Sequence, residues 1–129
     1  MKREITKEQA REAIASIILS SGVGRATDNA KDFLGGGYVN LTFTSGVWAD
    51  EATVEISEQH GEVIREQGET VGATAEYRVQ VGWSSTHRSV SSALVACKNY
   101  ARAIEFASLV QATAENFPTV VLYRKDKEA

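Results

Sequence analysis

Two histidines are the side chains of this sequence best suited to acid–base chemistry. His87 stands close to Ser84, Ser85 and Ser89, so it could serve as the general base that activates a serine hydroxyl. No carboxylate lies near it in the sequence to orient the imidazole. His60 lies in the segment EQHGE, which we interpret as a hairpin turn. We therefore expect both histidines to be polar surface residues, and we predict no catalytic residue and no enzymatic activity.

The other reactive groups are a cysteine and an adjacent pair of acids. Cys97 is the only cysteine of the chain and lies in an apolar segment, where we expect a small buried side chain rather than a nucleophile. Asp50 and Glu51 follow Trp48. Because neighbouring side chains on a strand point to opposite faces, we expect both acids in a solvated turn. These residues do not have the spacing of a metal site, so we predict neither a metal nor another cofactor.

A third chemical feature is the segment SSGVGRAT, residues 20–27, between two predicted helices. It has a glycine, an apolar residue and a second glycine, with a threonine three positions later. Over about residues 13–34 the sequence resembles the hairpin of helix-hairpin-helix DNA-binding motifs. The resemblance implies that backbone N–H groups of this turn face a DNA phosphate. The nucleic-acid contacts that it implies are Gly22, Val23, Gly24, Arg25 and Thr27, with Lys31 and Arg11 as further phosphate contacts.

Charge around this turn and over the whole chain favours a simpler interpretation. Asp28 and Asp32 would place negative charge close to the phosphate. The chain has 14 basic and 17 acidic residues and a net charge of -3, whereas a protein that depends on phosphate contacts usually carries a basic surface. Nucleic-acid binding through the turn therefore stays the alternative to a structural turn between packed helices.

Two helices are predicted before residue 37. Thr6 and Gln9 form a capping box at the start of the first, and Ile5 and Ala10 stand where a hydrophobic staple would pack. Apolar residues then recur at intervals of three and four, which predicts one buried face made of Ala10, Ala13, Ile14, Ile17 and Ile18. Gly22 is expected to supply the left-handed position after this helix. A second helix over about residues 27–34 is expected to stop at the three glycines 35–37.

From residue 38 onward the apolar period changes to two, which predicts half-buried strands. Alternation marks residues 38–44 and 52–57, and a short strand is expected at 62–66 between Gly61 and Gly68. The longest strand carries its apolar side chains on one face, at Ala75, Tyr77, Val79, Val81 and Trp83. We expect the other face of this antiparallel meander to be solvated, because it carries Thr42, Thr53, Glu55, Arg78 and Gln80.

Residues 90–117 form a run of about seven helical turns that is apolar on nearly every side. A surface helix usually shows one apolar stripe, so a helix without a polar face must be covered on two sides. We expect the sheet to be one cover, and either the first helix or a second copy of the chain to be the other. Ile104 should lie near the middle of this contact, where an aspartate would cost on the order of several kcal/mol. Pro118 ends the helix, and residues 119–124 are predicted as a last strand.

Together these elements predict a single α+β domain over residues 1–129. It comprises an N-terminal helical hairpin, an antiparallel β-meander of three to four strands, a long apolar helix packed on the sheet, and a C-terminal strand. The apolar fraction of 43% and the single proline are typical of a globular chain. The first eight residues do not resemble a secretory signal, and no apolar run reaches the ~20 residues needed to span a bilayer. We expect a soluble cytoplasmic protein with no membrane partner.

The apolar helix makes assembly the leading functional hypothesis. We predict a non-enzymatic interaction protein, either a homo-oligomeric structural subunit or a small accessory or inhibitor protein that covers a partner's surface. Large apolar and aromatic side chains dominate interfaces, so the predicted interface residues are Trp48, Tyr100, Ile104, Phe106 and Leu109. For Trp48, capping of the sheet's end is an equal interpretation.

Two further expectations follow from size and composition. The short length, the mild acidity and the lack of a catalytic motif resemble those of many small phage-encoded proteins, for which the location would be the host cytoplasm or the virion. A third functional hypothesis is a small ligand-binding protein or enzyme. Its site would be a cleft between the sheet and the glycine segment, lined by His87, Ser85 and Tyr77.

Overall fold

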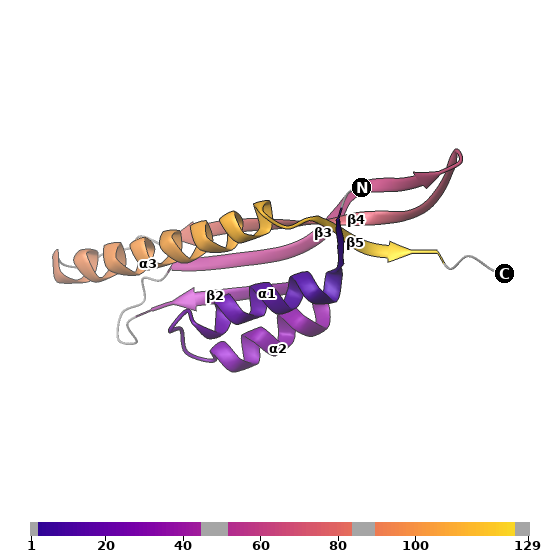
Figure 1. Ribbon diagram of the computed structural model, residues 1–129. Coiled ribbons are helices and arrows are strands. Elements are labelled where there is room, and N and C mark those ends of the chain that lie inside the picture. Colours follow the sequence, from indigo (N-terminus) through magenta and orange to yellow (C-terminus); the bar gives the residue numbers. More distant parts are fainter. Residues whose placement is uncertain (1–2, 45–51, 84–89, 126–129) are drawn as a thin grey trace.

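The computed structural model describes residues 3–44, 52–83 and 90–125, and these form a mixed α+β fold (Figure 1). In chain order the elements are β1 (Glu4–Thr6), α1 (Lys7–Leu19), α2 (Ala26–Gly36), β2 (Tyr38–Phe43), β3 (Ala52–Glu66), β4 (Glu69–Trp83), α3 (Val90–Glu115) and β5 (Thr119–Arg124). The helical hairpin, the meander, the long helix and the last strand are therefore confirmed, and the residues predicted for the last strand are those of β5.

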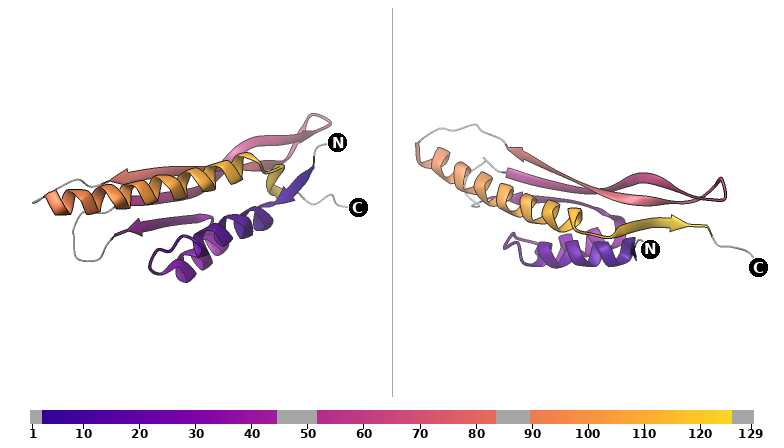
Figure 2. Two further views of the ribbon diagram at one scale, coloured as in Figure 1. Left: turned by 60° about the vertical axis from the view of Figure 1, so that its left-hand side comes forward. Right: turned by 45° about the horizontal axis from the view of Figure 1, so that its top comes forward.

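The strands form one sheet in the order β1-β5-β4-β3-β2. The meander β2-β3-β4 is antiparallel, and β5 returns beside β4 in the antiparallel sense. Figure 2 shows α3 lying along the β3–β4 hairpin while α1 and α2 lie beside β2. The short strand β1 pairs with β5 in the parallel sense; the sequence did not predict it, because three residues are too few to show an alternation.

The first helix has the local chemistry that its sequence predicts. The Thr6 hydroxyl accepts a hydrogen bond from the Gln9 N–H at 3.1 Å, and the Gln9 side chain accepts one from the Thr6 N–H at 2.9 Å. Ile5 packs in the same small cluster as the buried Ala10, as a hydrophobic staple requires. Gly22 has φ +76°, but it lies beyond the cap residue Ser20, in the turn rather than at the helix end.

The glycines that follow act differently from the prediction. α2 extends through Gly35 and Gly36, and only Gly37 leaves the helix, with φ +70°. A Cβ on Gly37 would lie 2.9 Å from the Glu58 Cβ, so a side chain fits neither the backbone conformation nor the space. One glycine, rather than the triplet, therefore ends the helix.

The prediction that His60 lies in a hairpin turn is wrong. β3 continues through His60 and Gly61 to Glu66, with an irregularity in its pairing between His60 and Val63. A Cβ on Gly61 would lie 2.5 Å from the Thr74 Oγ1, so this glycine permits a close approach of two strands rather than a turn. The hairpin turn is at Gln67 and Gly68, which both have positive φ.

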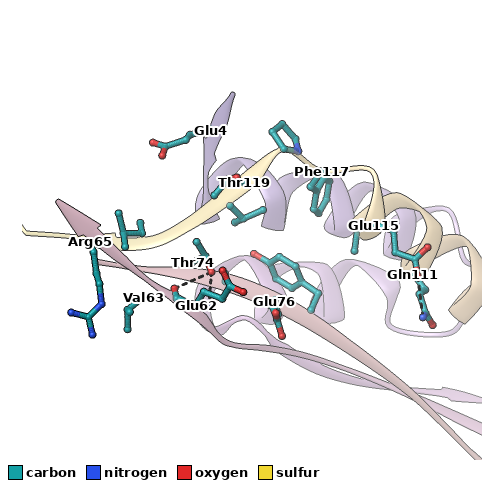
Figure 3. A pocket seen from close by; sticks show the side chains of 16 residues that line it. Glu4, Glu62, Val63, Arg65, Thr74, Glu76, Gln111, Glu115, Phe117 and Thr119 are labelled. Carbon is teal, nitrogen blue, oxygen red and sulfur yellow. Dashed lines mark hydrogen bonds between the residues drawn. The ribbon is translucent and has the colours of Figure 1, made fainter. Parts of the chain in front are cut away.

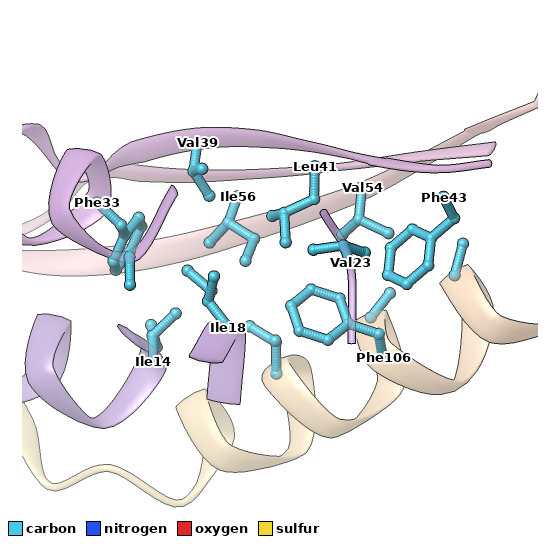
Figure 4. Close-up of a cluster of buried hydrophobic side chains, with 14 of the residues drawn as sticks. Ile14, Ile18, Val23, Phe33, Val39, Leu41, Phe43, Val54, Ile56 and Phe106 are labelled. Atoms are coloured by element: carbon cyan, nitrogen blue, oxygen red, sulfur yellow. The ribbon is translucent and has the colours of Figure 1, made fainter. Parts of the chain in front are cut away.

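The core lies between the helices and one face of β2, β3 and β4 (Figure 4). Phe33 of α2 is fully buried, and the ring of Phe106 lies 5.7 Å from that of Phe43. The opposite sheet face carries the exposed Asn40 and Arg78, so the solvated face is confirmed. The main core residues are Ile14, Ile18, Val23, Phe33, Val39, Leu41, Phe43, Val54, Ile56, Ala103, Phe106 and Val110.

Two predictions about the long helix are wrong. Phe106 was expected at an intermolecular interface, but it is 6% exposed and belongs to the core of the chain itself. Cys97 was expected to be buried, and it is exposed. The reason is the position of the sheet, which covers only the side of α3 that carries Ala103, Phe106 and Val110.

Candidate functional site

The outward side of α3 carries exposed apolar residues, which we call the apolar flank: Leu94, Cys97, Tyr100 and Ile104. Leu94 is 59% exposed, Tyr100 37% and Ile104 40%. They recur at intervals of three and four residues, so they lie along one side of the helix. Of the two predicted covers, the sheet is present. The first helix contacts α3 but leaves this flank open.

An aromatic pair joins the flank to the sheet. The rings of Trp83, at the end of β4, and Tyr100 stack with centroids 4.8 Å apart and planes inclined by 23°. Trp83 remains 42% exposed. Tryptophan and tyrosine offer large apolar surfaces at a low cost in conformational entropy, and they are the residues most enriched at interface hot spots. From the sequence, Trp83 was placed on the apolar face of its strand, and its contact with Tyr100 was not predicted. The sequence does not show how far β4 extends relative to the helices.

The remaining predicted interface residues lie elsewhere. Leu109 is 54% exposed, but it stands about two and a half turns from Tyr100 and therefore on the other side of α3. There it lines a cavity of about 370 Å³ together with Ile17 and Arg102. Trp48 lies outside the described residues, as do Asp50 and Glu51.

The edge of β4 beside the apolar flank is open for most of its length. β5 pairs with β4 only from Gly72 to Thr74, and no other described strand pairs with that edge. The Glu58 N–H donates to the Gly37 carbonyl beside β2 at 2.7 Å. Since successive residues of a strand direct their main-chain groups alternately to the two neighbours, Glu55 and Ser57 of β3 direct theirs to β4, where their partners are Gln80 and Arg78. Tyr77, Val79 and Val81 therefore direct theirs to the open edge.

A cleft of about 770 Å³ lies where β5 diverges from β4 (Figure 3). Ala75, Tyr77, Phe117 and Pro118 form part of its lining, and acidic side chains surround it. The Thr74 hydroxyl accepts a hydrogen bond from the Glu62 N–H at 2.8 Å and donates one to the Glu62 carbonyl at 3.1 Å, which holds the two strands together at this point. The acidic residues of the lining are Glu4, Glu62, Glu76 and Glu115, and Arg65 is the basic one.

One lining residue, Tyr77, belongs to a buried polar network that the sequence did not reveal. Arg11 of α1 donates to both carboxylate oxygens of Glu58 on β3, at 2.9 and 2.7 Å, and the Tyr77 hydroxyl donates to Glu58 at 2.8 Å. The Arg11 and Glu58 side chains are only 12% and 6% exposed. These residues are far apart in the sequence, so only the fold brings them together.

Each group in this network has a shifted pKa. Burial by itself raises the pKa of the Glu58 carboxyl, but hydrogen bonds from Arg11 and Tyr77 outweigh it, and the pKa lies below its ordinary value. Burial, together with the bond to Glu58, raises the pKa of the Tyr77 hydroxyl. The hydrogen bond to Glu58 raises the pKa of Arg11. The network is thus a fixed anion held by a cation and a neutral phenol, an arrangement that fastens α1 to the sheet.

The glycine turn lies between α1 and α2, as the helix-hairpin-helix resemblance implies. Val23 is buried in the core, and its N–H donates to the Ser21 hydroxyl at 3.4 Å. Arg25 has a left-handed backbone and forms an exposed ion pair with Asp28 at 3.7 Å. The expectation that Arg11 contacts a phosphate is wrong, because its guanidinium is buried against Glu58. Gly24, Thr27 and Lys31 are exposed.

Of the two histidines considered for acid–base chemistry, the structure describes His60. His60 is exposed, as expected for a surface residue, and its ring lies 6.0 Å from that of Tyr123. His87, Ser84, Ser85 and Ser89 lie outside the described residues. Within residues 3–44, 52–83 and 90–125, no group of three potential metal-ligating side chains is found.

Comparison with known proteins gives no indication of the function. No protein-family model, no curated protein and no solved structure matches this chain. Among the helices that the structure describes, none combines the length and the apolar character needed to cross a membrane. The surface features that bear on function are the apolar flank, the open edge and the cleft.

Proposed function

We propose that this protein is an assembly protein, which acts by self-association through the apolar flank of α3 rather than by catalysis. The observation that carries the proposal is the exposure of Leu94, Tyr100 and Ile104 on one side of a helix that buries Ala103, Phe106 and Val110 against the sheet. Exposed apolar residues scattered singly are normal on a protein surface, whereas a contiguous group marks an interaction site.

A second copy of the chain is the partner that the surroundings of the flank favour. The flank borders the open edge of β4, and an open edge pairs best with another extended strand. Each copy carries such an edge and such a flank together. Self-association therefore covers both features at once, in both copies, without a segment from another protein.

The test is the mass of the protein in solution, measured by light scattering over a concentration series. The wild-type chain is expected to form a defined oligomer, and Ile104→Asp is expected to remain folded and fall to the mass of the monomer. Leu34→Asp is the matched control, because Leu34 lies on α2 with nearly the same exposed fraction, 41% against 40%. A wild-type monomer at every concentration overturns the proposal, and so does an equal loss of mass in both variants.

A further inference from the structure

We propose that two copies pair through β4 in the antiparallel sense about a two-fold axis at Val79, so that their sheets join into one. In this arrangement the Trp83–Tyr100 pair of each copy enters the cleft of the other. The inference rests on the proposed self-association and specifies its geometry. Three observations carry it: the extent of the open edge, the side chains along that edge, and the position of the cleft.

The extent of the open edge determines the register. β5 occupies this edge as far as Thr74, and β4 ends at Trp83. A strand that pairs with its own copy in the antiparallel sense must be symmetric about its midpoint, and the midpoint of residues 75–83 is Val79. A centre closer to Thr74 would bring the incoming strand against β5, and a centre closer to Trp83 would leave part of the edge unpaired.

The side chains are compatible with this register on both faces of the sheet. On the helix side, Tyr77 lies opposite Val81 of the other copy, and Val79 lies opposite Val79 of the other copy. All three are partly buried and pack against the core, so pairing extends the core. On the open face, Arg78 lies opposite Gln80. Two like charges directly opposite each other would destabilise the pair. This register does not place like charges opposite each other.

The same register places the aromatic pair at the cleft. Trp83 lies opposite Ala75 of the other copy, and Ala75 lines the cleft together with Phe117 and Pro118. Figure 3 shows Phe117 on one side of this cleft and the strand that carries Thr74 and Glu76 on the other. A volume of about 770 Å³ is within the range of sites that enclose a molecule of several rings. By symmetry, each copy gives one aromatic pair and receives one.

The long helix extends in the direction that this arrangement requires. In Figure 1 the amino-terminal turns of α3 project past the end of β4. Because the strands are antiparallel, those turns point along the other copy rather than into solvent. The exposed Leu94 and Cys97 then lie beside the partner.

Disulfide trapping tests the register directly. Residues 78 and 80 do not direct their main-chain groups to the open edge, so in the dimer they face each other as a pair without hydrogen bonds. The Cα atoms of such a pair are about 4.5 Å apart, within the range that a disulfide spans. Two variants are needed, Arg78→Cys and Gln80→Cys, each also carrying Cys97→Ser to remove the exposed native thiol. Under mild oxidation their mixture is expected to give a disulfide-linked dimer in high yield.

The control for trapping is Asn40→Cys, also with Cys97→Ser. It places a thiol on the same solvated face at the other edge of the sheet, on β2. Mixed with Gln80→Cys, it is expected to remain uncrosslinked. A second variant, Val79→Pro, removes a main-chain N–H that points to the open edge rather than to β3, so the fold is retained while the mass falls to that of the monomer.

The outcomes separate this inference from the proposed function. An oligomer that gives no crosslink between positions 78 and 80, or that tolerates Val79→Pro, overturns the β4 pairing and leaves self-association through the flank intact. A chain that is monomeric at all concentrations overturns both. Crosslinking at 78 and 80 together with dissociation by Val79→Pro supports both.

Discussion

The inner and outer sides of α3 differ in environment although their sequences are similar. Phe106 is 6% exposed and packs on Phe43, whereas Ile104, two positions earlier in the chain, is 40% exposed. Both are large apolar residues, and both were predicted at an interface. Apolar character therefore identifies a surface that requires a cover, while the position of the sheet decides which part of that surface the chain itself covers.

The largest expected effect concerns the inner side. Phe106→Ala removes a buried aromatic ring and leaves a cavity between α3 and β2, so the free energy of unfolding should fall by about 3–5 kcal/mol. Chemical denaturation followed by circular dichroism measures this loss. A loss below about 1 kcal/mol would mean that Phe106 is not part of the core, and the distinction between the two sides of α3 would fail.

The next effect concerns the network of Arg11, Glu58 and Tyr77, and it depends on pH. Since the pKa of Glu58 in the folded protein lies below its ordinary value of 4.5, its contribution to stability is present above that value and is lost as the pH falls through the folded pKa. The free energy of unfolding should therefore decrease below about pH 4.5.

Glu58→Gln is the control for this pH dependence. The variant should be less stable at neutral pH, because it leaves the buried Arg11 without its counter-ion, and its stability should change less between pH 6 and pH 3. Equal slopes for the two proteins would remove Glu58 as a cause. The contacts proposed for the outer side are apolar and main-chain contacts, so no corresponding pH dependence is expected for association.

A smaller effect on stability is expected from the outer side. At concentrations where the protein is monomeric, Ile104→Asp should lower the free energy of unfolding by less than about 1 kcal/mol, because the side chain already contacts water. The same substitution should abolish association. If it instead unfolds the monomer, Ile104 belongs to the core and the outer side of α3 is not a free surface.

The smallest effect is expected at the glycine turn. Arg25 and Asp28 form an ion pair whose side chains are 82% and 63% exposed, and such pairs contribute little. Arg25→Glu should change the free energy of unfolding by less than about 0.5 kcal/mol and leave the oligomer mass unchanged. If the wild-type protein binds duplex DNA at low salt and Arg25→Glu abolishes that binding, the nucleic-acid alternative is favoured instead.

The elements whose signals are local could be predicted from the sequence. The capping box of Thr6 and Gln9, the alternation along β2 and the bounds of β5 after Pro118 are all confirmed, because caps, periods and proline act within a few residues. The high apolar content of α3 was also evident from the sequence, since composition does not depend on the fold.

The features that depend on residues distant in the chain could not be predicted and became visible only in the folded structure. It brought Arg11, Glu58 and Tyr77 together, carried β3 through Gly61, and paired β1 with β5. It also left Cys97 and Ile104 facing outward, because the sheet can cover only one side of a helix. Burial and strand pairing are properties of a contact between two segments, and neither segment alone contains that information.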